Sequence, residues 1–177
     1  MLGLGSGVSQ GAVASNILKS NTYTFESSVS PWTAHSVEGT LTMQAGQSAP
    51  GSSDSDWMKC TYDTNQTSAS GIRVLNWGTS GIMAANDVFT VTCDLHVVDD
   101  SGKWGTDAPI EFRVQLGGVS NTNAIALDTT SLNHTFTATV ASSGGNNLVI
   151  EVHTSPDRPQ AGAVFYIRNI RAELVRP

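Results

Sequence analysis

Lysine is scarce in this chain of 177 residues, which has Lys19, Lys59 and Lys103 and no others. The formal net charge is −6, and no basic stripe runs along the sequence. Nucleic-acid binding needs a concentrated positive patch, and anionic membranes attract polybasic segments. We therefore expect no nucleic acid and no membrane among the partners.

Long apolar runs and a cysteine framework are also missing. No run approaches the roughly 18 apolar residues that a membrane-spanning helix requires. The two cysteines, Cys60 and Cys93, are too few for a disulfide scaffold. Each falls on the apolar side of an alternating segment, so we expect buried, reduced thiols. Whether they pair stays open, because a disulfide requires Cα atoms within about 7 Å.

What the chain does contain favours strands and turns. Gly, Ser, Thr and Asn together exceed a third of the residues, and charged residues make up 14%. From residue 17 onward the apolar residues recur with a period of two. The expected strands are 22–26, 38–45, 56–63, 71–77, 87–98, 110–116, 133–140, 148–152 and 163–175. One apolar and one polar side per strand predicts an all-β fold, a two-sheet antiparallel β-sandwich or jelly roll.

The clearest strands, 87–98 and 110–116, carry polar residues on the side away from the core. These are Asp94, His96, Arg113 and Gln115. If the two strands pair, their side chains form a polar patch able to hydrogen-bond sugar hydroxyls.

Three tryptophans, Trp57, Trp77 and Trp104, are candidate platforms for sugar stacking, because an indole face packs well on a pyranose ring. Trp57 is opposite in phase to Met58 and Cys60, so it is expected to point outward. The alternative is that the three rings cap the edges of the sandwich or lie in subunit contacts.

Residues 1–16 form a Gly-rich segment that we interpret as an N-terminal arm ahead of a domain at 17–177. Its apolar contacts would come from Leu2, Leu4, Val8 and Val13. No Lys or Arg precedes Lys19, and Gly and Ser interrupt the apolar residues, so we expect no signal peptide and synthesis in a host cytoplasm. The arm either packs on its own domain or docks on a partner in an assembly.

Several segments resemble, in order and spacing, the carbohydrate-binding modules of families 4 and 9. They are Asn16-Ile17-Leu18 with Asn21 and Phe25-Glu26, then Pro31-Trp32, 39–42, 87–95, 135–138 and 164–170. The resemblance implies a galactose-binding-like jelly roll that binds glycans, commonly with a structural calcium ion. Arg168 stands where the closing motif of those modules has Asp, so we expect no calcium ion here and no other cofactor.

Enzyme chemistry finds little basis in the sequence. Asp94 and Glu111 lie mid-strand among residues typical of a solvated face, rather than as an acid–base pair in a cleft. The histidines are scattered without metal-ligand spacing, and no nucleophile elbow is present. We expect neither catalysis nor a metal site.

A jelly roll that starts with a Gly-rich arm resembles virion proteins of tailed bacteriophages in style and context. The first hypothesis is therefore a non-enzymatic virion structural protein, in capsid decoration, tail, baseplate or fibre. It would be a homo-oligomer anchored to other virion proteins by its arm, with the jelly roll displayed toward a host glycan. The alternative is a stand-alone carbohydrate-binding module for a polysaccharide or cell-surface glycan.

Overall fold

The computed structural model describes residues 16–78, 82–99, 102–104, 109–141, 145–153 and 158–177. This part of the chain contains eleven strands and no helix. The strands are β1 Asn16–Tyr23, β2 Thr33–His35, β3 Leu41–Gln47, β4 Trp57–Tyr62, β5 Ser70–Val74, β6 Val88–Val97, β7 Ile110–Leu116, β8 Val119–Ile125, β9 Thr130–Thr139, β10 Leu148–Val152 and β11 Val164–Arg176.

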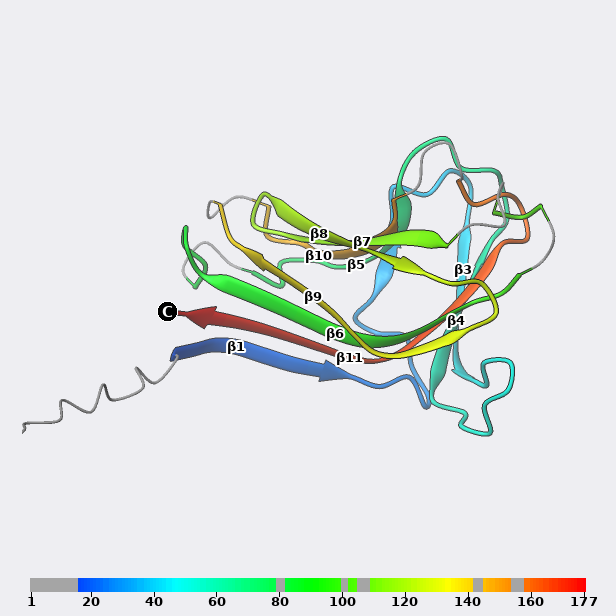
Figure 1. Ribbon diagram of the computed structural model, residues 1–177, viewed down its shortest axis with the longest axis horizontal. Coiled ribbons are helices and arrows are strands. Elements are labelled where there is room, and N and C mark those ends of the chain that lie inside the picture. Colours follow the sequence, from blue (N-terminus) through cyan, green and yellow to red (C-terminus); the bar gives the residue numbers. More distant parts are fainter. Residues whose placement is uncertain (1–15, 79–81, 100–101, 105–108, 142–144, 154–157) are drawn as a thin grey trace, which may run out of the picture.

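The strands form two sheets packed face to face (Figure 1). One sheet has the order β3-β4-β11-β6-β9, with β1 also paired to β11; the other has the order β2-β5-β10-β7-β8. Every pairing between named strands is antiparallel. The predicted all-β, two-sheet antiparallel sandwich is confirmed.

Alternation along β6 and β7 places the core as the sequence predicts. Phe89, Val91 and Leu95 of β6 are buried, as are Phe112 and Val114 of β7. These side chains meet between the two sheets, while the residues between them point to the outer faces.

The last strand, β11, is the longest and lies inside its sheet. Its first half pairs with β4 and its second half with β1, while β6 runs along its other side. A β-bulge separates Arg168 from Arg171, and Asn169 within it has φ of 50°. Such a bulge bends a strand, and here it falls where the neighbour on one side changes from β4 to β1.

The sequence analysis missed two strands, β8 and β2. β8 is an edge strand with only three apolar residues among its seven, so it shows little hydrophobic alternation. β2 has only three residues, too few to show a period. β1 begins at Asn16, whereas the alternation predicted a strand only from residue 22. Residue 16 thus belongs to the sandwich, and the rest of the predicted arm, with Leu2, Leu4, Val8 and Val13, lies outside the described residues.

Both cysteines are buried and free. Burial raises the pKa of each thiol, so both stay protonated and unreactive in the folded state. The prediction of buried, reduced thiols is confirmed.

Candidate functional site

The outer face of the β2-β5-β10-β7-β8 sheet carries a compact set of polar side chains. Antiparallel register aligns the outward residues of neighbouring strands into rows. One row runs Thr33, Arg73, Val149, Gln115, Ser120, and the next runs His35, Gly71, Glu151, Arg113, Thr122. We call the surface made by these two rows the polar face.

Glu151 is the centre of the polar face. Its side chain is 2% exposed, yet it ends in a charge. Arg113 donates from Nε to Oε1 over 2.7 Å, and a second guanidinium nitrogen lies 2.5 Å from the same oxygen. Gln115 also donates to Oε1. A buried carboxylate is stable only when it is paired in this way, so these contacts fix the positions of Arg113 and Gln115.

Gly71 makes room for Glu151 from the neighbouring strand. A Cβ atom at position 71 would lie 2.3 Å from the carbonyl oxygen of Ile150 and 2.6 Å from the Cα atom of Glu151. Any side chain there would push β5 away from β10. Glycine therefore lets the two strands approach closely beneath the polar face.

His35 connects Glu151 to Arg73. Its Nε2 atom faces Oε2 of Glu151 at 3.8 Å, and its Nδ1 atom lies 3.5 Å from a guanidinium nitrogen of Arg73. Burial lowers the pKa of His35, Glu151 partly opposes this, and the guanidinium groups of Arg73 and Arg113 lower the pKa further. The lowered pKa keeps the ring neutral at pH 7, so His35 adds no charge next to Arg73.

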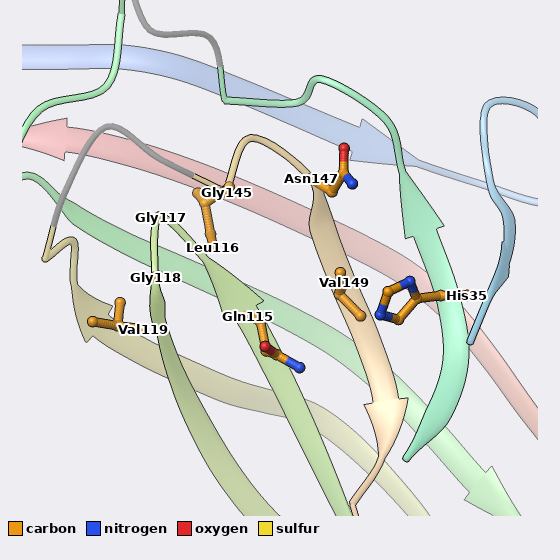
Figure 2. A pocket seen from close by; sticks show the side chains of 9 residues that line it. All are labelled: His35, Gln115, Leu116, Gly117, Gly118, Val119, Gly145, Asn147 and Val149. Atoms are coloured by element: carbon orange, nitrogen blue, oxygen red, sulfur yellow. The ribbon is translucent and has the colours of Figure 1, made fainter. Parts of the chain in front are cut away.

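A hollow of about 220 Å³ opens beside these groups, at the end of the face where β7 turns into β8 (Figure 2). Gly117 and Gly118 form this tight turn with φ of 59° and 77°, values that suit a two-residue hairpin. Figure 2 shows His35 and Gln115 on either side of Val149. The lining residues are His35, Gln115, Leu116, Gly117, Gly118, Val119, Gly145, Asn147 and Val149.

The structure divides the predicted polar patch between two sheets. Arg113 and Gln115 lie on the polar face, whereas Asp94 and His96 belong to β6 of the other sheet. β6 and β7 do not pair, because the chain crosses from one sheet to the other between them. The prediction of a single patch is therefore wrong.

His96 and Asp94 are also not free to meet a ligand. His96 is 2% exposed and packs edge-on against Tyr166 with its Nδ1 atom 3.0 Å from the hydroxyl of Thr130. Asp94 is 5% exposed and accepts hydrogen bonds from Arg168, Asn169 and the backbone of Asn133.

Arg168 lies among three carboxylates on the outer side of the β4–β11 pair. It donates to Asp54 at 2.7 Å, Asp56 at 2.8 Å and Asp94 at 3.0 Å. Burial acts to lower the pKa of Arg168, but the three carboxylates together raise it above its usual value. The guanidinium thus supplies the positive charge that these carboxylates face. Among the described residues, no group of three or more His, Cys, Asp or Glu side chains is placed to hold a metal ion.

The three candidate tryptophan platforms are buried, so this prediction is wrong. Trp57 has the outward phase that alternation predicts, but the Arg168 guanidinium lies over its ring at 4.5 Å and the preceding loop covers it. Trp104 packs edge-on against Tyr62 and donates to the carbonyl of Val98. Trp77 is closed off under Lys19, whose ammonium is 5.1 Å from the ring. Trp77 and Trp104 belong to the hydrophobic core.

Sequence reasoning missed Glu151, His35 and Arg73. Glu151 left one usable signal, a charged residue inside the apolar run 148–152. Such a residue needs a partner on a neighbouring strand. His35 and Arg73 left no signal, because they reach Glu151 only through strand pairings that alternation does not reveal.

The architecture is shared with solved glycan-binding modules. A structure of the CBM22-1 xylan-binding domain from Paenibacillus barcinonensis Xyn10C is 16% identical, with a TM-score of 0.53 over 94% of this chain and 99% of that one. The C-terminal family 22 carbohydrate-binding module of Clostridium thermocellum Xyn10B is 14% identical, with a TM-score of 0.52 over 87% of this chain and 91% of that one. A xylan-binding domain from CBM 22 is 14% identical, with a TM-score of 0.55 over 87% of this chain and 93% of that one.

The fold is that of a carbohydrate-binding-module jelly roll. At this identity the likeness shows the fold alone, and these structures belong to family 22 rather than to families 4 and 9. No protein-family model matches the chain, and no curated protein matches it by sequence. No helix of the described residues is long and apolar enough to cross a membrane.

Proposed function

We propose that the protein is a non-catalytic module that binds a glycan on the polar face. One observation carries the proposal: a buried carboxylate, Glu151, fixes Arg113 and Gln115 beside a hollow on an otherwise open sheet. Fixed donors and acceptors bind hydroxyl groups at little ordering cost. The solved modules of the same fold, two of which are named as xylan-binding, support a glycan as the ligand.

Recognition on this face depends on hydrogen bonds rather than on ring stacking. All four tryptophans and all five phenylalanines are at most 2% exposed. The rows of the polar face contain no aromatic residue apart from His35. The contacts open to a sugar are therefore the side chains of residues such as Gln115, Asn147 and Arg113.

The test is affinity electrophoresis of the folded protein through gels that contain a panel of soluble polysaccharides, neutral and acidic. We expect at least one polysaccharide to retard the protein. Gln115→Ala should weaken the retained interaction by about tenfold, which corresponds to about 1.4 kcal/mol for one lost hydrogen-bonding group.

Gln44→Ala is the matched control, since Gln44 is an exposed glutamine on β3 of the opposite sheet. Circular dichroism should show that both variants remain folded. No retardation by any polysaccharide, or an equal loss in both variants, contradicts binding on the polar face.

A role in a phage particle stays a separate proposal. It rests on residues 1–16, of which 1–15 lie outside the described residues, and on the style of the sequence. Removal of residues 1–15 should abolish incorporation into particles if the segment is an anchor, whereas glycan retention should survive. Virion and oligomer partners depend on this proposal and not on the polar face.

A further inference from the structure

We propose that the glycan held on the polar face is acidic and that Arg73 binds its anionic group, a carboxylate or a sulfate ester. This inference rests on the proposed function and names the class of ligand for the same site. The observation behind it is an arginine whose charge no carboxylate of the described residues neutralises.

Arg73 differs from its neighbour Arg113 in its partners. Arg113 is paired with Glu151, whereas no Asp or Glu of the described residues lies within 4.0 Å of the Arg73 guanidinium. The polar contact of Arg73 is the neutral ring of His35 at 3.5 Å. Its Nε atom is buried without a hydrogen-bond acceptor, and such a buried donor carries a desolvation penalty.

The two acidic residues within the strands of this sheet, Glu151 and Glu111, do not balance this charge. Glu151 already accepts from Arg113 and Gln115. Glu111 faces outward from β7, two strands and two rows away, which is roughly 16 Å at strand spacings of about 4.8 Å and about 3.3 Å per residue. At that distance, salt screens most of its effect on Arg73. The local group of Arg73, Arg113 and Glu151 therefore keeps one net positive charge.

Arg73 lies beside the hollow, next to two of the residues that line it. Val149, its cross-strand partner, and His35, its contact, both line the hollow. A guanidinium presents its donors as a planar fork that matches a carboxylate or sulfate. Because the whole chain carries a charge of −6, a polyanion gains no general attraction from it. Binding of an acidic polysaccharide therefore requires a local site.

The experiment compares polygalacturonate with its highly methyl-esterified form in affinity gels and in titration calorimetry. Polygalacturonate should bind at least about tenfold more tightly than the ester, since the charge-assisted contact is lost on esterification. Added NaCl should weaken the difference. Dextran sulfate against dextran forms the second arm, and it shows whether sulfate replaces carboxylate as the recognised anion.

Arg73→Gln should abolish the preference for the charged polymer and leave binding of the esterified polymer unchanged. Arg73→Lys should keep part of that preference, because it keeps the positive charge. Arg171→Gln is the control, because Arg171 is a 60%-exposed arginine on the opposite sheet and the change in net charge is the same. Equal binding of charged and neutral polymers overturns the inference and leaves glycan binding intact. Equal losses in the Arg73 and Arg171 variants also overturn it. Failure of these polymers and of every polysaccharide in the wider panel to bind overturns the proposed function itself.

Discussion

A single arginine, Arg168, holds together a part of the molecule that would otherwise repel itself. Its guanidinium is 13% exposed and meets Asp54 and Asp56 of the loop before β4 and Asp94 of β6. Its flat side covers Trp57. Removal of the guanidinium would leave three carboxylates facing one another, one of them buried.

Arg168→Gln should therefore lower the free energy of unfolding by about 2–4 kcal/mol, since it removes one partner of a largely buried ion pair. Urea denaturation followed by tryptophan fluorescence measures the change. Arg171→Gln, which breaks an exposed pair with Glu173, should cost less than about 1 kcal/mol. Similar costs for both variants would show that the Arg168 network contributes nothing beyond a surface ion pair.

At the scale of elements, the close approach of β5 to β10 supports the polar face. The pairing brings Gly71 opposite Glu151 and leaves no room for a side chain on the glycine. The carboxylate keeps its place above the sheet only while these two strands keep their spacing.

Gly71→Ala should lower the free energy of unfolding by about 1–3 kcal/mol through overpacking, and it should also weaken glycan retention because Glu151 moves. Chemical denaturation and the affinity gel give the two readouts. Gly51→Ala, in the loop before β4, meets no atom within 4 Å and has φ of +77°, so it should affect stability through backbone strain alone. If the Gly71→Ala variant were retained by the glycan as strongly as the unchanged protein, binding on the polar face would not depend on the spacing of β5 and β10.

Local alternation predicted the strands but not how they assemble. β7 and the first six residues of β6 bury every second side chain, and a period of two identified both strands. Their placement in different sheets depends on pairings between distant residues, such as β6 with β11 and β7 with β10. The candidate site has the same limit. Arg113 and Gln115 could be predicted from the alternation of a single strand. Glu151, His35 and Arg73 come together only through the register of strand pairing, which the sequence pattern does not reveal.

Trp57 shows a second limit of sequence reasoning. Its phase correctly placed it on the outer side of β4. Its burial comes from Arg168, which lies more than a hundred residues later in the chain, and from the loop before β4. A strand pattern describes which side of a sheet a residue takes, and it contains no information on what later covers that side.

Across the whole molecule, one buried and two partly buried histidines couple stability to pH. Burial lowers the pKa of His35, His96 and His134 below the ordinary value of 6.5. The unfolded chain therefore binds protons more readily than the folded one as the pH falls below 6.5. The stabilisation is complete above that pH and is lost progressively toward the lower pKa values of the folded state.

The free energy of unfolding should thus be lower at pH 5.5 than at pH 7.5, as urea titrations at the two values would show. His134→Gln should reduce this pH dependence, because it removes one of the three titrating rings and leaves the polar face intact. An unfolding free energy that is constant, or that rises on acidification, would contradict the assignment of these rings as neutral in the fold.

The position of β11 also determines when the sandwich can form during synthesis. β11 is the last strand in the sequence, yet it lies between β6 on one side and β4 and β1 on the other. A ribosome releases the ten earlier strands first, with β4 and β6 still lacking the neighbour that joins them. Each would present an unpaired edge open to other chains. A nascent chain that stalls before Val164 is therefore aggregation-prone, because the six-stranded sheet can form only after β11 has been synthesised.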